Sequence, residues 1–329
     1  MIARLTRRIA LAGLLALGLA APAAAQGYPA RPVTIIVPFA AGGPSDLIAR
    51  LLAEHMGRTI GQQILVENVA GAGGTAGAKR LAAAEPDGYT LLIHHLALAA
   101  APSLYEGLGY DTLTAFAPIG LINTGPMVIT GKKTLPPNDA KAFFAYARAQ
   151  GDKLTLAHAG IGSNAHLCAV LMSQTLGVKF TQVAYRGTGP AMNDLVAGQV
   201  DALCDQSTTA VPQVEAKAVK GYAVTSLGRL DVLKDLPTAK EAGTPIEMTV
   251  WHGLYAPKGT SDAILDKLNG ALRGALKDPK VLERFKAAGT STFPQAQWTR
   301  AAHAAYFKAE VEKWAKALRA AGATPSAIK

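Results

Sequence analysis

A strand-like run, two glycines and a helix-like run follow one another within residues 34–56, and this stretch limits the possible folds of the chain most. Residues 34–38 are uncharged and mostly β-branched, a composition typical of a buried strand. Residues 47–56 place large apolar side chains on one helical face. Gly42 and Gly43 lie between the two runs, where glycine permits a tight turn and a close approach to the backbone. The pattern predicts a βα unit of an α/β protein.

The start of this predicted helix has the features of an anion site. Pro44 suits the first helical position, and Asp46 falls in the first turn, where a carboxylate can accept bonds from free N–H groups. A glycine loop before a helix directs unpaired N–H groups and the positive end of the helix dipole at one small volume. An ordinary βα turn, which also favours glycine, is the alternative. The candidate binding residues here are Phe39, Ala41, Gly42, Gly43, Ser45 and Asp46.

The same pattern occurs twice more along the chain. Residues 154–158 form a strand pattern that leads through a glycine-containing loop into a helical pattern closed by Gly177. Residues 180–185 lead through a third loop into a helix that Pro190 opens. The hydroxyl or amide at the start of the second helix can cap it. The candidate binding residues in these two loops are Gly160, Ile161, Gly162, Ser163, Asn164, His166, Tyr185, Gly187 and Thr188.

Polar side chains also follow two other strand patterns. His94 and His95 come directly after residues 89–93, and Asp205 ends the run 200–205. Open α/β sheets bind ligands at the carboxyl ends of their strands, so all three residues are candidates. One histidine can donate a hydrogen bond to a bound anion, or the pair can serve only to cap the turn that follows. Both interpretations stay open.

The sequence predicts neither a cofactor nor a metal. Gly71, Gly73 and Ala76 nominally fit the dinucleotide fingerprint, but such a site needs an acidic residue at the end of the next strand. That strand ends instead in the two adjacent histidines. No spaced acid or third histidine near them completes a metal site. Basic residues are scattered without interleaved aromatic residues, so nucleic acid is not an expected partner.

Residues 1–25 have the pattern of a secretory signal peptide. Three arginines precede an apolar run at 9–20 that is too short to span a bilayer comfortably, and small residues then precede Gln26. We therefore expect export to the periplasm. The formal charge of +10 falls by three when these arginines are removed. The remaining positive charge favours solubility and would help to collect anionic solutes.

The remaining chain, about 300 residues, fits two domains. We expect the first domain to comprise residues 26–125 and 251–329, and the second to comprise residues 126–250. Cys168 and Cys204 are the two cysteines. In an oxidising compartment they can form one disulfide or remain two separate buried thiols, and the sequence leaves both open.

The chain resembles the Bug family, the periplasmic receptors of tripartite tricarboxylate transporters. The resemblance covers essentially all residues after the signal segment and is carried by an ordered set of motifs at 28–32, 37–46, 66–74, 86–92 and 223–226. It implies a two-domain type II periplasmic-binding-protein fold that closes on its ligand. It also implies that the first loop and residues 158–164 hold a ligand carboxylate, largely through backbone N–H groups and water.

These observations favour a solute receptor and not an enzyme, because no nucleophile–base or metal constellation is evident in the sequence. The expected ligand is a small organic carboxylate, either an aliphatic di- or tricarboxylate or an aromatic acid. The expected partners are the membrane subunits of a transporter or a sensor kinase, and the expected state is a monomer. The alternative is an exported hydrolase that uses Ser163, His166 and Asp205.

Overall fold

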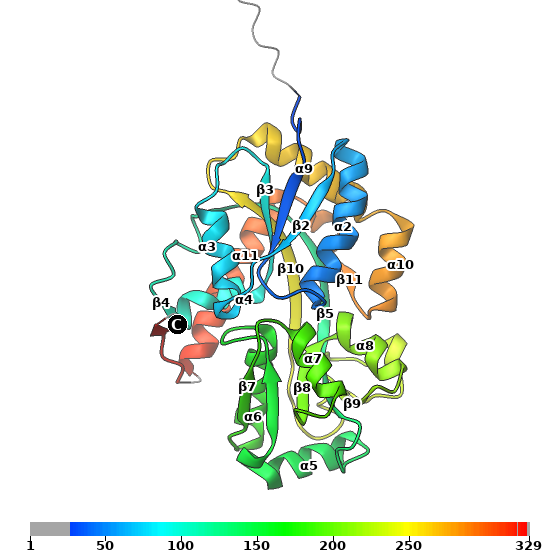
Figure 1. Ribbon diagram of the computed structural model, residues 1–329. Coiled ribbons are helices and arrows are strands. Elements are labelled where there is room, and N and C mark those ends of the chain that lie inside the picture. The colour runs from blue at the N-terminus through cyan, green and yellow to red at the C-terminus, as the bar shows by residue number, and fades with distance from the viewer. Residues whose placement is uncertain (1–26, 321, 328–329) are drawn as a thin grey trace, which may run out of the picture.

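The computed structural model describes residues 27–320 and 322–327 (Figure 1). The expected signal segment, residues 1–25, lies outside the described residues. The chain forms an α/β structure in which parallel strands alternate with helices. Among the described residues, no helix combines the length and the apolar character that crossing a membrane requires.

The first domain, in the upper part of Figure 1, holds the strands at one end of the sheet path. β1 pairs in parallel with β2 and β3, and β10 joins antiparallel to β3. These strands are β1 (Val33–Val37), β2 (Ile64–Asn68), β3 (Thr90–His95) and β10 (Thr249–Pro257). Its helices are α2 (Pro44–Ile60), α3 (Thr75–Ala82), α4 (Leu96–Ala100), α9 (Asp262–Ala275), α10 (Pro279–Ala287) and α11 (Arg300–Ala320). Three two-residue strands lie beside them, β4 (Tyr105–Glu106), β11 (Ser291–Thr292) and β12 (Ser326–Ala327).

The second domain, in the lower part of Figure 1, repeats the alternation. β6 pairs in parallel with β7 and β8, and β9 runs antiparallel to β5. Its strands are β6 (Thr155–His158), β7 (Thr181–Ala184), β8 (Ala202–Gln206) and β9 (Val219–Val224). Its helices are α5 (Ala140–Gln150), α6 (Asn164–Leu176), α7 (Thr188–Val196) and α8 (Ser207–Glu215).

One long strand, β5 (Phe116–Lys132), passes through both domains. Up to Pro126 it pairs with β10, and from Met127 onward it pairs with β8 and β9. The change of partners falls at the Gly125–Pro126 step, a pair of residues typical of a bend. We propose the domain boundary here, next to the boundary that the sequence predicts after residue 125.

Buried Thr225 ties together the two segments that cross between the domains. Its hydroxyl donates a hydrogen bond to the carbonyl of Met248 (2.6 Å) and accepts one from the N–H of Met127 (2.9 Å). Because these buried hydrogen bonds reach both crossings, Thr225 fixes how the two segments lie together.

The second domain contains a disulfide that the sequence leaves open. Cys168 on α6 is bonded to Cys204 on β8, and both residues are fully buried. The two cysteines are 36 positions apart in the chain. It therefore fixes α6, the helix that follows the second loop, against β8, the strand that carries Asp205.

Candidate functional site

Four helices begin where the two domains meet: α2, α6, α7 and α8. Each follows the carboxyl end of a strand, which is where ligands bind in open α/β sheets. Their first turns surround a small cavity of about 20 Å³. Its lining comes from both domains and comprises Phe39, Gly43, Pro44, Ser45, His95, Met127, Ala159, Ser163, Asn164, Ala165, Thr188, Asp205 and Gln206.

The loops of the two domains touch directly beside this cavity. The N–H of Ala40 donates a hydrogen bond to the carbonyl of Arg186 (3.0 Å). The hydroxyl of Tyr105 donates to the carbonyl of Ile161 (2.6 Å). Glycine makes the close approach possible, because a Cβ at Gly189 would lie 2.5 Å from the carbonyl oxygen of Ala41. The two halves are therefore closed against each other.

Asp46 shapes the first loop and does not line the cavity. Its carboxylate accepts a hydrogen bond from the N–H of Gly42 (3.0 Å) and another from the side-chain amide of Asn68 (3.0 Å), and it pairs with Arg50 (3.0 Å). Burial alone would raise the pKa of Asp46, but the hydrogen bonds from Arg50, Gly42 and Asn68 lower it below its usual value. The residue is thus a structural anion whose charge is already balanced.

The second loop is held by two histidines. The ring Nδ1 of His158 accepts a hydrogen bond from the N–H of Gly160 (3.1 Å), and that of His166 accepts one from Gly162 (3.2 Å). Burial lowers the pKa of His166 to about 4, so its ring is neutral and can accept. These two loop N–H groups are therefore occupied, although the sequence reasoning treats the loop backbone as available to a ligand.

The backbone N–H groups of the second domain that can still bind a ligand lie in the first turn of α6. Ser163 is the N-cap, and its hydroxyl accepts a hydrogen bond from the N–H of His166 (3.2 Å). The N–H groups in the first turn of a helix have no acceptor within that helix. Those of Asn164 and Ala165 lie in this turn of α6, and both residues line the cavity. They add to the positive end of the α6 dipole at the cavity wall.

Two buried side chains of the cavity wall have polar atoms without a partner. Neither amide atom of Asn164 finds a hydrogen bond within the described residues, although the residue is only 2% exposed. The same holds for the side-chain oxygen of Gln206, which is 5% exposed. A buried unpaired polar group costs about 1–3 kcal/mol. Such a cost is retained where a bound molecule supplies the missing partner.

The two adjacent histidines have different roles. His95 caps α4 by accepting a hydrogen bond at Nδ1 from the N–H of Ala97 (3.1 Å), and it also lines the cavity with its ring stacked on Phe39. The pKa of His95 lies well below its ordinary value, mainly because the ring is buried and further because His94 and His252 are close to it. A neutral ring that accepts at Nδ1 carries its proton on Nε2 and can donate there. His94 does not line the cavity, and its Nδ1 accepts a hydrogen bond from the N–H of His95 (2.9 Å).

Asp205 is fully buried at the end of β8. Its carboxylate accepts hydrogen bonds from the N–H of Gln206 (2.8 Å) and the hydroxyl of Thr209 (2.5 Å). Burial raises the pKa of Asp205 to about 6, against the lowering effect of these hydrogen bonds. It is the one acidic residue among those that line the cavity, and the lining set includes no lysine or arginine.

The hydrolase interpretation requires a proton path from Ser163 to His166 and on to Asp205. The described contacts give a different arrangement. The ring of His166 is bonded to Gly162, and the hydroxyl of Ser163 is bonded to the backbone of His166 and not to its ring. Asp205 bonds to its own helix start. The three side chains therefore do not form a catalytic triad in this arrangement.

The structure brings together part of the predicted site. Eight of the predicted residues line the cavity: Phe39, Gly43, Ser45, His95, Ser163, Asn164, Thr188 and Asp205. The other ten are not among the lining residues: Ala41, Gly42, Asp46, His94, Gly160, Ile161, Gly162, His166, Tyr185 and Gly187. Tyr185, for example, donates its hydroxyl proton to Asp194 (2.6 Å).

Sequence reasoning missed several lining residues, among them Met127, Ala165 and Gln206. It also missed a row of buried, hydrogen-bonded side chains behind the cavity, in which His252 lies between Ser45 and Asn123. The position of Gln206 directly after a predicted strand end was an available signal. The pairing of His252 with a residue 207 positions away was not visible in any local pattern.

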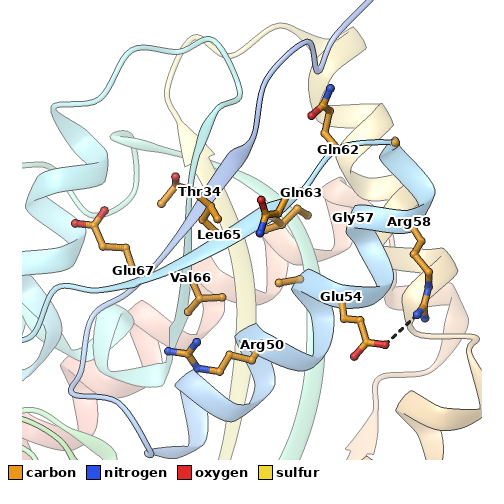
Figure 2. Close-up of a pocket in the computed structure, with 13 residues that line it drawn as sticks. Thr34, Arg50, Glu54, Gly57, Arg58, Gln62, Gln63, Leu65, Val66 and Glu67 are labelled. Atoms are coloured by element: carbon orange, nitrogen blue, oxygen red, sulfur yellow. Dashed lines mark hydrogen bonds and ion pairs between the residues drawn. The ribbon is translucent and has the colours of Figure 1, made fainter.

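A wider hollow of about 1150 Å³ lies on the outer side of the first domain, between α2 and β2 (Figure 2). Its basic side chains are already paired, Arg50 with Asp46 (3.0 Å) and Arg58 with Glu54 (2.9 Å). None of its lining residues also lines the interdomain cavity. Within the part of the chain that the structure describes, no group of three or more potential ligands is placed to hold a metal ion.

Comparison with known proteins gives consistent matches along the chain. Residues 48–322 match the family TctC, described as "Tripartite tricarboxylate transporter family receptor". A protein of Agrobacterium vitis from the ttuE–ttuC' intergenic region is 47% identical over 300 residues, covering 91% of this chain and 87% of that protein. BugT of Bordetella pertussis is 33% identical and covers 97% of this chain and 98% of its own length.

Solved structures match equally well. The periplasmic binding protein BugD is 45% identical with a TM-score of 0.89, covering 91% of this chain and all of BugD. MatC from Rhodopseudomonas palustris, solved with bound malate, is 40% identical with a TM-score of 0.84 and covers 88% of this chain and 99% of its own. An R. palustris protein solved with adipate is 31% identical with a TM-score of 0.85, covering 91% of this chain and 100% of its own.

Proposed function

Because the chain belongs to the TctC family of tripartite tricarboxylate transporter receptors, also called Bug proteins, we propose that it binds a small organic carboxylate in the periplasm and delivers it to a transporter. The family is one of periplasmic solute receptors, and relatives have been solved with malate and with adipate. The proposed ligand class is an aliphatic di- or tricarboxylate or an aromatic acid. The proposed partners are the membrane subunits of that transporter.

The observation that carries this proposal is the meeting of helix starts at one buried cavity. The first turns of α2, α6 and α8 supply N–H groups and positive dipole ends, and the amide of Asn164 lies unpaired among them. Several N–H donors can hold a carboxylate by charge-assisted hydrogen bonds without a salt bridge. The absence of lysine and arginine from the described cavity lining fits this mode of binding.

The size of the cavity implies that binding involves movement of the domains. A space of about 20 Å³ admits about one water molecule, not an organic acid. A solute must therefore enter while the loops around Ala40 and Arg186 are apart, and closure then brings donors from both domains onto it.

A thermal-shift screen of aliphatic and aromatic carboxylates tests this function. A ligand at 100 times its dissociation constant adds about 2.7 kcal/mol to the stability of the folded protein. We expect at least one small carboxylate to raise the melting temperature, and the corresponding amide or methyl ester to leave it unchanged. Equal shifts with the neutral analogues would contradict carboxylate recognition.

A further inference from the structure

A chain of buried hydrogen bonds runs from the core of the first domain to the cavity. The side-chain oxygen of Asn123 on β5 lies 3.1 Å from Nδ1 of His252 on β10. Nε2 of the same ring lies 3.1 Å from the hydroxyl oxygen of Ser45 at the start of α2. All three residues are at most 2% exposed, and Ser45 lines the cavity.

The chemistry of these three groups fixes where the protons lie. The amide oxygen of Asn123 can only accept, so Nδ1 of His252 carries the ring proton. Burial lowers the pKa of His252 to about 3, so the ring is neutral and its Nε2 is a bare acceptor. The hydroxyl of Ser45 must therefore donate its single proton to His252. Toward the cavity, Ser45 offers only lone pairs.

A second acceptor lies in the cavity wall. The side-chain oxygen of Gln206 is buried there without a partner among the described residues. An ionised carboxylate has no proton to give and cannot satisfy either acceptor. A hydroxyl or ammonium group elsewhere on the ligand can.

We propose that Ser45 is a fixed hydrogen-bond acceptor, oriented by His252 and Asn123, and that it selects carboxylates carrying a hydroxyl or ammonium group over the same acids without one. The inference rests on the proposed function and names the ligand class of the same site. Ser45 is the residue that contacts the ligand, and His252 and Asn123 are positioning residues. A site built to pair with a ligand donor rejects the analogue that lacks it, because the acceptor is then left buried and unpaired.

Calorimetric titration with three matched sets of acids tests the inference: propionate, lactate and alanine; succinate, malate and aspartate; glutarate, 2-hydroxyglutarate and glutamate. Within the set that binds most tightly, we expect the hydroxy or amino acid to bind at least tenfold more tightly than the unsubstituted acid. Ser45→Ala should bring this affinity ratio close to one. Ser45→Thr should retain the ratio, because threonine keeps a hydroxyl that can donate to His252.

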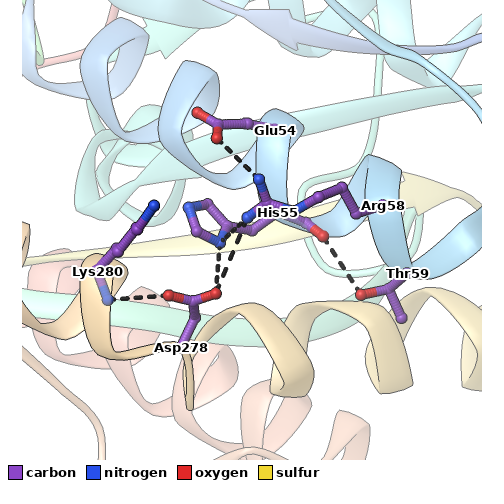
Figure 3. A network of polar contacts seen from close by, with 6 residues as sticks. All are labelled: Glu54, His55, Arg58, Thr59, Asp278 and Lys280. Atoms are coloured by element: carbon purple, nitrogen blue, oxygen red, sulfur yellow. Dashed lines mark hydrogen bonds and ion pairs between the residues drawn. The ribbon is translucent and has the colours of Figure 1, made fainter.

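His252→Phe tests the positioning role, because it removes the acceptor of the Ser45 proton and should also lower the ratio. Circular dichroism establishes that this variant is folded, and Asn123→Leu probes the same chain if it is not. The matched control is His55→Gln, on the same helix as Ser45 but far from the cavity, where His55 is bonded to Asp278 (2.8 Å) in a separate polar network (Figure 3). It should lower the melting temperature and leave the ratio unchanged.

The outcomes separate the two proposals. Equal binding within the tightest set by the wild-type protein, or a ratio retained by Ser45→Ala, would overturn the inference and leave the carboxylate receptor standing. Failure of all nine acids to bind the folded wild-type protein would overturn the inference, and if no aliphatic or aromatic carboxylate of the thermal-shift screen binds either, carboxylate binding itself is overturned.

Discussion

Asn164 occupies the first helical position of α6, where its backbone N–H and its side-chain amide both lie at the cavity. The residue is buried and its amide is unpaired within the described chain. Its neighbours Ser163 and His166 are already bonded to each other, so they are less available to a ligand. Asn164 is therefore the side chain that the proposed function most clearly predicts to bind the ligand.

Asn164→Asp should weaken carboxylate binding by about 100-fold or more, because it places a like charge in a buried wall with almost no change of shape. Titration calorimetry with the acid that gives the largest thermal shift measures the effect. The matched control is Asn193→Asp, which makes the same change at an exposed position of α7 and should have little effect. Undiminished affinity in the Asn164→Asp variant would contradict the assignment of Asn164 to the site.

The sequence located helix starts well and hydrogen-bond partners poorly. Ser163 was expected near the cap of its helix, since serine is favoured there and glycines precede it. The use of the Gly160 and Gly162 N–H groups by two imidazoles was not predictable. It depends on the direction of each ring, and a local pattern of residue types does not contain that information.

The close contact between the first loop and α7 depends on Gly189, which lies inside the helix at a φ that other residues adopt. A Cβ there would meet the carbonyl oxygen of Ala41 at 2.5 Å and the carbonyl carbon of Gly42 at 3.1 Å. Both of those atoms belong to the backbone of the other domain and cannot turn aside as a side chain can. Glycine is thus needed here so that the first loop can approach α7 closely, and not because the backbone of α7 has an unusual conformation.

Gly189→Ala should therefore hold the domains apart and lower ligand affinity at least tenfold, while the second domain stays folded because alanine favours a helix. The control is Gly270→Ala in α9, where a Cβ meets nothing within 4 Å. That change should raise stability by about 0.5–1 kcal/mol and leave affinity unaltered. Calorimetry and chemical denaturation of both variants decide the matter, and full affinity in Gly189→Ala would count against closure at this contact.

Most elements were predictable because their apolar periods are regular, and the exceptions have physical reasons. α8 was not expected, since Pro212 lies inside it and proline usually ends a helix. β5 is one continuous strand whose partners change at Pro126, although a glycine–proline pair favours an interruption. Which strands pair across the domains is set by long-range packing and not by the period of any one segment.

The stability of the whole chain should fall in acid because several buried histidines are neutral when folded. Burial lowers the pKa of His94, His252 and His303 to about 3. Once unfolded, each ring binds a proton below about pH 6.5. Between about pH 6.5 and 3 the unfolded state therefore binds more protons, and each ring lowers the free energy of unfolding by about 1.4 kcal/mol per pH unit.

Asp205 acts in the opposite direction, since its folded-state pKa is raised to about 6 and the folded protein holds that proton as the pH falls. The net expectation is a loss of several kcal/mol between pH 7 and 5, measured by urea denaturation at each pH. His303→Phe should reduce the dependence of the unfolding free energy on pH by about 1.4 kcal/mol per pH unit, because it removes one of these buried neutral rings. Neither nitrogen of that ring has a partner within the described residues, so the substitution breaks no hydrogen bond there. An unchanged slope in this variant would show that His303 is not one of the groups responsible.

The two domains are joined by few segments, namely β5 and the chain that enters β10, and Thr225 fastens both where they cross. Other interdomain contacts include the loop contacts around Ala40 and Gly189 and the hydrogen bond from Tyr105 to Ile161. Such a connection lets the domains rotate as rigid bodies about the crossing, because few interactions must break. A ligand that gains donors from both domains only after closure shifts the population toward the closed form.

Small-angle scattering should therefore report a smaller radius of gyration for the wild-type protein when the acid that gives the largest thermal shift is added at saturation. Gly189→Ala should show a smaller decrease at the same occupancy, because its Cβ opposes the last contact between the loops. Gly270→Ala should behave as the wild type does. If the scattering profile of the wild-type protein is identical with and without saturating ligand, the domains do not close on it, and the cavity must instead admit its ligand through local movement of the loops.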